Sequence, residues 1–270
     1  MTPEAIARFV DELASASGAV ILPFFRAAFE TQDKSVGGVF DPVTAADRGA
    51  EQVIRAAIKQ RFPQHGIIGE EFGAENADAD YVWILDPIDG TKSFISGLPT
   101  WGTLIGLTHK GRPVYGMMHQ PFTRERFFGD GVSARWRGLG AEMRMIERQL
   151  RTRPCASLAE ATIMTTSPLL LTEAQRIKYK HVEAQTRLHR YGGDCYAYCM
   201  LASGHADLVI EAGLKPYDIV ALIPIIEGAG GVVTTWDGGE AAGGGAIIAA
   251  GDRRVHAAAL RLLADRKSVV

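Results

Sequence analysis

The stretch that decides the fold is Trp83-Ile84-Leu85-Asp86-Pro87-Ile88-Asp89-Gly90-Thr91-Lys92-Ser93-Phe94. The apolar run at residues 81–85 predicts one short buried strand. We expect this strand to stop at Asp86-Pro87, because proline cannot donate a ladder hydrogen bond and restricts the residue before it. Asp89-Gly90-Thr91 then predicts a turn whose glycine leaves a backbone N–H open to a ligand. Two carboxylates three positions apart, with a hydroxyl beside them, suit hard cations and a phosphate.

The composition is that of an ordinary soluble globular protein, with 47% hydrophobic and 22% charged residues in 270. Lys and Arg number 29 and Asp and Glu 31, so the formal net charge of −2 does not favour nucleic acid. No apolar run is long enough to span a bilayer, and the N-terminal residues predict an amphipathic helix rather than a secretory signal. The cysteines Cys155, Cys195 and Cys199 form no Cys-x-x-Cys pair and favour a reduced, cytoplasmic location with buried thiols.

Residues 1–148 predict an α+β half. Thr2 and Pro3 begin a helix whose apolar face runs to Phe24, and Pro23 should kink its end. Residues 31–43 predict irregular chain or a short hairpin around Gly37-Gly38, and a second helix starts at Thr44 and ends before Pro63. Strands follow, with Gly111 and Gly116 marking turns or close approaches, which predicts a mostly antiparallel meander. The expected strands are 66–69, 81–85, 103–108, 114–119, 125–129 and 133–137.

Residues 149–270 predict an α/β half. A polar join at residues 138–157 spans the boundary between the two halves. Strands are expected at 161–165, 188–191, 206–211, 231–235 and 246–250. Helices are expected at 172–185, 194–203, 217–228 and 252–263. Strands that alternate with helices favour crossover connections and a more parallel sheet. Pro224 lies inside the predicted 217–228 helix and makes its regularity doubtful.

Acidic residues collect at the ends of predicted elements. Glu70-Glu71 follow the strand at 66–69, Asp47 lies in the first turn of the second helix, and Asp218 opens a helix. Taken singly, each has a simpler interpretation: solvated loop acids for Glu70-Glu71, a helix-dipole partner for Asp47 and an N-cap for Asp218. The histidines show no zinc-site spacing, so the all-oxygen set favours Mg²⁺ or Mn²⁺. The spacing alone predicts an oxygen-ligand metal site of modest specificity.

Three sequence blocks, taken in order, resemble the signature blocks of the inositol monophosphatase superfamily. They are Gly69-Glu70-Glu71, then Asp86-Pro87-Ile88-Asp89-Gly90-Thr91, then Tyr217-Asp218 with Glu227-Gly228-Ala229-Gly230-Gly231. Thr44-Ala45-Ala46-Asp47 also matches the start of a family helix, so the resemblance covers nearly the whole chain. It implies an α/β fold, the layered α/β/α/β/α sandwich of this family, with the active site in the cleft between residues 1–148 and 149–270.

The resemblance also implies a role for each matching residue. Two or three Mg²⁺ ions, or Mn²⁺, would be held by Glu70, Asp86, the carbonyl of Ile88, Asp89 and Asp218, with Asp47 and Glu71 reaching a third ion through water. The implied catalytic residues are Glu70, Thr91 and Asp89, of which Glu70 and Thr91 orient and deprotonate the attacking water. The N–H groups of Gly90 and Thr91 would bind phosphate oxygens. The implied reaction is hydrolysis of a phosphate monoester without a covalent enzyme intermediate.

Within the superfamily, three stretches are most similar to the bacterial histidinol-phosphate phosphatases. They are Asp89-Gly90-Thr91-Lys92-Ser93-Phe94-Ile95-Ser96-Gly97, Gly192-Gly193-Asp194-Cys195-Tyr196 and Glu211-Ala212-Gly213-Leu214-Lys215-Pro216-Tyr217-Asp218. The resemblance implies hydrolysis of L-histidinol phosphate in histidine biosynthesis, with Asp194, Glu211, Gly193 and Lys92 contacting the substrate. A carboxylate at Asp194 would pair with the substrate's ammonium or imidazole, although capping the predicted helix explains Asp194 equally well. The resemblance also implies a homodimer and inhibition by lithium.

Three alternatives stay open at this point. A broad inositol-1-phosphate phosphatase is the first. A 3′(2′),5′-bisphosphate nucleotidase is the second: Lys92 favours it, but Asp194 and Glu211 oppose it, because a second phosphate calls for basic groups. The third, of another class, is a catalytically silent metal-binding homologue, which the complete acidic set argues against. Trp101 and Tyr196 could line a substrate pocket, although core packing is the usual role of large aromatics.

Overall fold

The structure is a computed structural model that describes residues 2–27, 31–33 and 42–264. Helices α1 (Pro3–Ile21) and α2 (Ala45–Arg61) pack together as its first layer. The Thr2 hydroxyl accepts the Ala5 N–H at 3.3 Å, and Pro23 lies in a short 3-10 turn (Leu22–Phe24) that ends α1, as predicted. Strands β1 (Thr31–Asp33) and β2 (Pro42–Thr44) pair antiparallel before α2, while the turn expected at Gly37-Gly38 lies outside the described residues.

The larger sheet has eight strands, and all neighbours pair antiparallel except β3 and β5, as the meander prediction expected. Two of its strands were not predicted. All five residues of the edge strand at 145–149 are exposed, so no apolar face marks it within the segment expected to be a join. The strands in spatial order are β10 (Met145–Gln149), β9 (Ala134–Leu139), β8 (Glu125–Gly129), β7 (Arg112–Gln120), β6 (Gly102–His109), β5 (Tyr81–Asp89), β3 (Gly66–Gly69) and β4 (Gly73–Glu75).

Strand β5 corrects the prediction that the chain leaves the sheet at Asp86-Pro87. It continues to Asp89, and its pairing with β6 shifts register between Asp86 and Asp89. The irregularity takes Pro87 out of the regular ladder, so its missing N–H leaves no neighbour without a donor. The Pro87 carbonyl instead accepts the Thr103 hydroxyl at 2.8 Å. The short helix α3 (Thr91–Ile95), also not predicted, begins directly after the strand.

The smaller sheet has five strands and is only partly parallel. Its first three strands run parallel, whereas β15 is antiparallel to both of its neighbours, so the expected parallel character holds for part of the sheet. The order is β12 (Leu188–Tyr191), β11 (Thr162–Thr165), β13 (Leu208–Leu214), β15 (Gly245–Ala250) and β14 (Val232–Thr235). The division of the chain into two domains near residue 148 stays a prediction.

The predicted single helix at 217–228 is wrong. The chain forms α6 (Pro216–Ile219) and α7 (Leu222–Gly228), separated at Val220-Ala221. Pro224 cannot donate to the carbonyl four residues earlier and its ring clashes there, so a continuous helix is excluded. The other helices of this half are α4 (Glu173–Glu183), α5 (Asp194–Ala202) and α8 (Arg253–Ala264), with 3-10 turns at Leu158–Glu160 and Pro168–Leu170.

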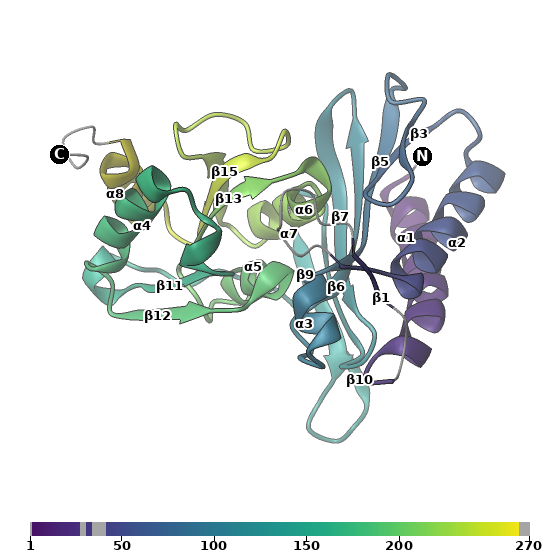
Figure 1. Ribbon diagram of the computed structural model, residues 1–270, viewed down its shortest axis with the longest axis horizontal. Coiled ribbons are helices and arrows are strands. Elements are labelled where there is room, and N and C mark those ends of the chain that lie inside the picture. The colour runs from purple at the N-terminus through teal and green to yellow at the C-terminus, as the bar shows by residue number, and fades with distance from the viewer. Residues whose placement is uncertain (1, 28–30, 34–41, 265–270) are drawn as a thin grey trace.

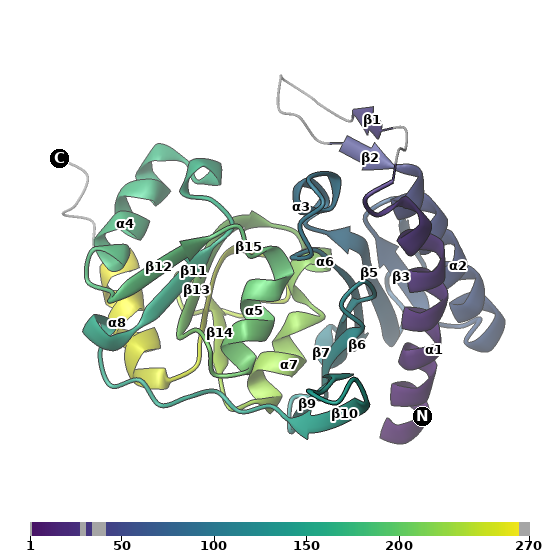
Figure 2. The same cartoon turned by 90° about the horizontal axis from the view of Figure 1, so that it is seen from below.

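The layers follow the order α/β/α/β/α, which confirms the predicted sandwich (Figures 1 and 2). Helices α1 and α2 cover one face of the larger sheet around a core that includes Phe9, Leu13 and Trp83. Helices α5 and α7 fill the space between the two sheets, and α4 and α8 cover the outer face of the smaller sheet. Each layer of apolar side chains is thereby covered on both sides.

A row of glycines lets the middle layer approach the larger sheet closely. Gly106, Gly116 and Gly129 are register partners across β6, β7 and β8. A Cβ added at Gly116 would lie 1.8 Å from the Ala221 carbonyl oxygen, so the segment between α6 and α7 rests directly on the strand backbones. This contact places α6, and with it Asp218, beside the end of β5.

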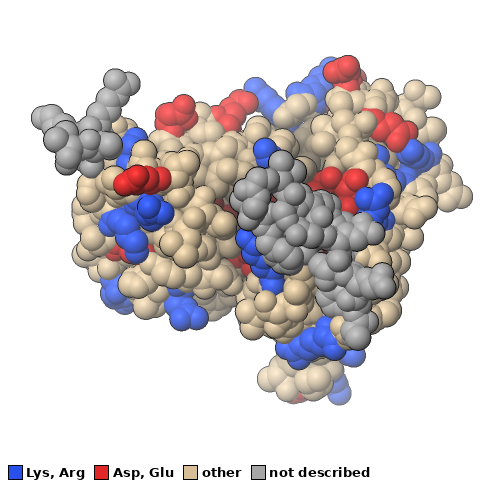
Figure 3. Space-filling view, in the orientation of Figure 1, with Lys and Arg blue, Asp and Glu red and all other residues tan. Residues whose placement is uncertain are grey.

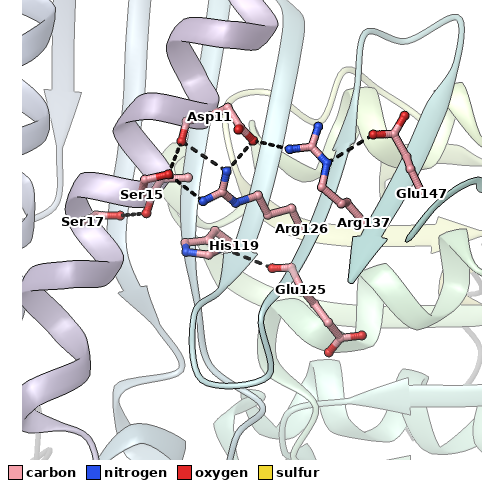
Figure 4. Close-up of polar contacts among 9 residues, drawn as sticks. Asp11, Ser15, Ser17, His119, Glu125, Arg126, Arg137 and Glu147 are labelled. Atoms are coloured by element: carbon pink, nitrogen blue, oxygen red, sulfur yellow. Dashed lines mark hydrogen bonds and ion pairs between the residues drawn. The ribbon is translucent and has the colours of Figure 1, made fainter. Parts of the chain in front are cut away.

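Polar contacts fix α1 on the far strands of the larger sheet. Asp11 of α1 forms ion pairs with Arg126 of β8 and Arg137 of β9, and Arg137 also contacts Glu147 of β10 at 3.2 Å (Figure 4). The Arg126 guanidinium donates to the Ser15 hydroxyl at 2.8 Å. These half-buried pairs join the first layer to the edge strand that the sequence did not predict.

Candidate active site

Three aspartates from two distant elements meet at the end of β5. Asp86 and Asp89 lie on that strand and Asp218 lies on α6, and each offers one carboxylate oxygen within 4.8 Å of the others. Asp86 is buried, whereas Asp89 and Asp218 are half-buried. Each accepts a backbone N–H: Asp86 that of Ile88 at 3.0 Å, Asp89 that of Cys195 at 2.7 Å, and Asp218 that of Lys215 at 2.7 Å.

Burial and mutual repulsion disfavour ionisation of this cluster. Burial raises the pKa of Asp86 well above its usual range, and the neighbouring Glu70, Asp89, Asp218 and Asp47 raise it further. Burial likewise raises the pKa of Asp89, with Asp218 as the next cause, and it raises the pKa of Asp218 to about 6. Buried carboxylates that repel one another are the donor set that a hard divalent cation stabilises, so these residues fit Mg²⁺.

The other predicted metal ligands lie around this cluster. Glu70 and Asp47 are near enough to raise the pKa of Asp86, and Asp47 in the first turn of α2 is only 2% exposed. Among the described residues, the group whose ligand oxygens all lie within 4.8 Å of one another does not include Glu70, Asp47 or Glu71. Glu71 lies 3.8 Å from Arg48 in an ion pair.

Glu51 is a site-supporting residue that sequence reasoning missed. It is fully buried, and its carboxylate accepts the N–H groups of Glu71 and Phe72 at 2.7 and 3.2 Å and the Arg55 guanidinium at 2.6 Å. A Cβ at Gly69 would lie 2.1 Å from this carboxylate, which explains the glycine before Glu70-Glu71. The signal available was the Glu51–Arg55 pair, four positions apart on the buried side of a predicted helix.

The turn after β5 consists of a left-handed glycine followed at once by a short helix. Gly90 has φ of 86°, a conformation that favours glycine, and it precedes the first turn of α3. The Thr91 hydroxyl donates to the Ile88 carbonyl at 3.2 Å. Thr91, which is expected to orient the attacking water, thus contacts the Ile88 carbonyl, which is an expected metal ligand.

Asp194 lies against this turn and is not a helix cap. Gly193 is the N-cap of α5 and no side-chain capping bond is present. Asp194 is the first helical residue, has φ of 42°, and accepts the Ser93 hydroxyl at 2.5 Å. A Cβ at Gly90 would lie 3.0 Å from the Cβ and Cγ of Asp194. Burial raises the pKa of Asp194, and the hydrogen bond from Ser93 partly offsets the rise.

Beside the cluster lies a cavity of about 170 Å³ whose lining is acidic. Asp89, Asp194, Glu211 and Asp218 line it, together with hydroxyl and apolar groups that include Thr166 and Tyr198. No Lys, Arg or His of the described chain is among the lining residues. A ligand portion that enters this cavity therefore meets carboxylates and hydroxyls.

Glu211 is buried at the cavity wall and accepts three hydrogen bonds. Its Oε1 accepts the N–H and the hydroxyl of Thr166 at 2.8 and 2.5 Å, and its Oε2 accepts the Tyr198 hydroxyl at 3.0 Å. Burial raises the pKa of Glu211, and the Thr166 and Tyr198 bonds lower it. Sequence reasoning placed Glu211 here but missed Thr166 and Tyr198, whose only signal is their position in space.

The remaining predicted contacts do not line the cavity. Gly193 is buried, and a Cβ there would lie 2.8 Å from Ala197 and 3.0 Å from Met164, so close packing explains this glycine. Lys92 is exposed and acts on Asp194 only as a nearby charge. Asp218, which does line the cavity, is the third residue of α6 and so is not the N-cap that its sequence position also allowed.

The large aromatic residues that could have lined a substrate pocket pack in the core instead. Trp101 is fully buried against Phe25 and Phe94. The Tyr196 hydroxyl donates to Glu125 of the larger sheet. The three cysteines are free and buried, as the sequence predicted.

Family comparison agrees with the fold and with the acidic site. The sequence profile of the inositol monophosphatase family matches residues 3–268. The chain belongs to the inositol monophosphatase family. Members of this family are metal-dependent phosphatases, typically with Mg²⁺, so this protein is a phosphoric monoester hydrolase of the inositol monophosphatase family that acts on a small phosphate ester.

Individual relatives span most of the chain. It is 45% identical over 262 residues to the bifunctional phosphatase IMPL2, chloroplastic, of Arabidopsis thaliana, which covers 93% of this chain and 72% of that protein. It is 34% identical to a histidinol-phosphatase of Chlorobaculum parvum, over 86% of this chain and 85% of the other. An inositol monophosphatase from Zymomonas mobilis has a TM-score of 0.85 at 40% identity, covering 97% of this chain and 99% of that one.

Two surface features bear on partners. No helix in the described part of the chain is long and apolar enough to cross a membrane. On the face that Figure 3 shows, Lys and Arg are interspersed with Asp and Glu and form no broad basic surface.

Proposed function

We propose that this family phosphatase hydrolyses L-histidinol phosphate to L-histidinol and phosphate, a step of histidine biosynthesis. The observation that carries the proposal is the cavity beside the aspartate cluster, where Asp194 and Glu211 are present and no basic side chain lines the wall. Histidinol phosphate carries an ammonium and a basic imidazole, both of which pair with carboxylates. The relatives that include a histidinol-phosphatase support the same choice.

The proposed metal site uses the residues that meet at the end of β5. Asp86, Asp89 and Asp218 would hold Mg²⁺ together with Glu70 and the Ile88 carbonyl, and Asp47 and Glu71 would support a weaker third site, with Mn²⁺ as a substitute ion. When bound, the metal would offset phosphate charge and make bound water more acidic. The fit rests on the crowded carboxylates, whose raised pKa values an added cation would lower again.

The turn after the strand would orient the reaction. The N–H groups of Gly90 and Thr91 would bind phosphate oxygens, because the positive φ of Gly90 leaves the backbone unobstructed there. The Thr91 hydroxyl, held by the Ile88 carbonyl, would align the attacking water, and Glu70 would accept its proton. Asp89, at the end of β5, would hold the metal beside the water that Thr91 and Glu70 handle.

Recognition of the alcohol would fall to the second half of the chain. Asp194 and Glu211 would pair with the two basic groups of the substrate, while Gly193 would act by holding Asp194 in place. Lys92 would lie at the rim, near the phosphate. Lithium would inhibit by competing for a metal position.

An inositol-1-phosphate phosphatase of broad specificity is the second candidate. The hydroxyls of Thr166 and Ser167 at the cavity wall favour it, because they could bond to polyol hydroxyls. A 3′(2′),5′-bisphosphate nucleotidase fits less well, because the acidic cavity would repel a second phosphate.

A side-by-side assay tests the proposal. Phosphate release would be measured from histidinol phosphate, inositol-1-phosphate and adenosine 3′,5′-bisphosphate, with Mg²⁺ and with EDTA. We expect kcat/KM to be highest for histidinol phosphate and activity to disappear with EDTA. A higher kcat/KM for inositol-1-phosphate would replace the proposed substrate, and no release from any ester would favour a silent homologue.

We further propose a cytoplasmic homodimer. Free, buried cysteines suit a reducing compartment, although one relative is chloroplastic. Light scattering on the purified protein would give the mass of either one or two chains of 29.2 kDa. Fluorescence microscopy of the tagged protein in its native cell would test the location.

A further inference from the structure

Two crossed hydrogen bonds join the phosphate-binding turn to the start of α5. Asp89 accepts the N–H of Cys195 at 2.7 Å, and Asp194 accepts the hydroxyl of Ser93 at 2.5 Å. The pairs lie 106 and 101 residues apart in sequence. The turn that is proposed to bind phosphate and the carboxylate that is proposed to bind the alcohol are therefore fixed relative to each other.

Ser93 is itself oriented by a second hydroxyl. Thr100 and Ser93 lie 3.0 Å apart, oxygen to oxygen, and Ser93 is 8% exposed. An ionised carboxylate only accepts, so Ser93 must donate to Asp194 and Thr100 must donate to Ser93. The chain of donors runs in one direction and leaves the Ser93 side chain a single useful rotamer.

Asp194 needs such support. Its φ of 42° is an uncommon backbone conformation for a residue other than glycine, and it persists only where the surroundings hold it. The absent side chain of Gly90 leaves room for the carboxylate, whose Oδ2 lies 3.1 Å from where a Cβ would be. Ser93 bonds to that same oxygen, and the Thr166 side chain also hydrogen-bonds to Asp194, so Ser93 is one of two hydroxyl groups that orient the carboxylate at the cavity wall.

We propose that Ser93, oriented by Thr100, is a specificity-positioning residue that fixes the Asp194 carboxylate for a cationic alcohol portion of the substrate. This inference rests on the proposed function, because it assumes that Asp194 meets a positively charged group. Ser93 does not touch the reacting atoms in this scheme. Its loss should therefore weaken binding of cationic esters and leave turnover of bound substrate largely intact.

The test compares Ser93→Ala with wild type on two esters, histidinol phosphate and the uncharged-alcohol ester glycerol 2-phosphate. We expect KM for histidinol phosphate to rise about tenfold, as for a lost hydrogen bond to a charged group, with kcat changed less than about twofold. KM for glycerol 2-phosphate should change far less. Ser93→Thr keeps the hydroxyl and should restore selectivity, whereas Thr100→Val should produce a smaller loss in the same direction.

A double variant shows whether Ser93 acts through Asp194. In an Asp194→Asn background, Ser93→Ala should have almost no further effect on selectivity, because the group that it positions is already neutral. Equal losses of kcat on both esters in Ser93→Ala would overturn the inference and make Ser93 a support of the phosphate turn. If Ser93→Ala does not fold, Thr100→Val decides the question by the same comparison.

The two proposals fail in different ways. If wild type shows no preference for histidinol phosphate over glycerol 2-phosphate, the proposed function is wrong and Ser93 has no specificity to support. If wild type prefers histidinol phosphate and Ser93→Ala keeps that preference, the function stands and the positioning role is wrong.

Discussion

Two groups of carboxylates, one at the end of β5 and one at the cavity wall, are stabilised in different ways. Asp86, Asp89 and Asp218 each accept one backbone N–H and otherwise crowd one another. Asp194 and Glu211, on the other side, accept hydroxyl donors, and Glu211 carries three hydrogen bonds. The same side-chain chemistry thus occurs in one environment dominated by burial and mutual repulsion and in one where hydroxyl groups of the protein supply hydrogen bonds.

This difference indicates what each group can do. Crowded, buried carboxylates are costly when ionised and favour a divalent cation from solution. Hydrogen-bonded carboxylates are held at fixed positions and suit a weaker, organic cation. The comparison predicts that substitutions in the first group abolish turnover, and that substitutions in the second change which ester is preferred.

The largest effect is expected from Asp89→Asn. Removing one charge from the cluster should lower kcat at least about 1,000-fold, because the site loses a proposed metal ligand and its negative charge. The variant should still fold and, in EDTA, should unfold at a higher temperature than wild type, since one source of repulsion is gone. The measurements are phosphate release and a thermal melt, with exposed Asp237→Asn as the matched control. Activity near wild type would remove Asp89 from the metal site.

Thr91→Ala should have the next largest effect. We expect kcat to fall about 100-fold with KM changed little, as for a group that aligns the nucleophile. Steady-state kinetics on histidinol phosphate at saturating Mg²⁺ measures this, and Thr91→Ser, which keeps the hydroxyl, should retain most activity. A rise in KM with unchanged kcat would instead make Thr91 a binding residue, closer in behaviour to the second group.

Asp194→Asn should change selectivity more than turnover. Replacing the charge by an amide of the same shape should raise KM for histidinol phosphate roughly 10-fold to 100-fold and leave glycerol 2-phosphate nearly unaffected. The matched control is the exposed Asp78→Asn. Equal losses on both esters would show that Asp194 supports the phosphate turn, and the contrast between the two groups would then be wrong.

The smallest effect on activity is expected at His119, which lies under α1 (Figure 4) and does not line the cavity. Burial, and next the neighbouring Arg126 charge, lower the pKa of this histidine from 6.5 to about 4. Between pH 6.5 and 4 the unfolded chain therefore takes up a proton at this histidine that the folded chain does not. The contribution of His119 to the free energy of unfolding is therefore complete above pH 6.5 and is lost as the pH falls toward 4. The loss from this group amounts to about 3 kcal/mol by pH 4.

Denaturant unfolding of wild type and His119→Gln at several pH values measures this contribution. The variant should lose stability less steeply between pH 6.5 and 4, while kcat at neutral pH stays unchanged; the exposed His189→Gln should behave as wild type. Parallel curves for wild type and His119→Gln would contradict the assignment. The experiment separates a general effect of acid on the fold from effects at the carboxylate groups.

Sequence alone predicted the layered fold and one complete piece of the site. The apolar run before Asp86, the turn at Asp89-Gly90-Thr91 and the capping residues of α1 act over a few positions, so local pattern is sufficient to predict them. Glu70 and Asp218 were candidates from their positions at element ends, and the family blocks supplied the roles expected of them. Two errors have non-local causes: the passage of β5 through Pro87 and the exposed edge strand β10 each depend on partner strands that a short window does not contain. The break before Pro224 has a local cause, which the proline itself indicated in the sequence.

Only the tertiary structure decided how the distant residues meet. The glycine row across β6, β7 and β8 lets the α6–α7 segment approach the sheet, which brings Asp218 to the strand that carries Asp86 and Asp89. The contact between Ser93 and Asp194, and the three donors on Glu211, likewise arise from segments far apart in the chain. The physical reason is that dihedral preferences and hydrophobic periodicity act between neighbours, whereas close backbone contacts and buried hydrogen bonds form only when separate layers pack together.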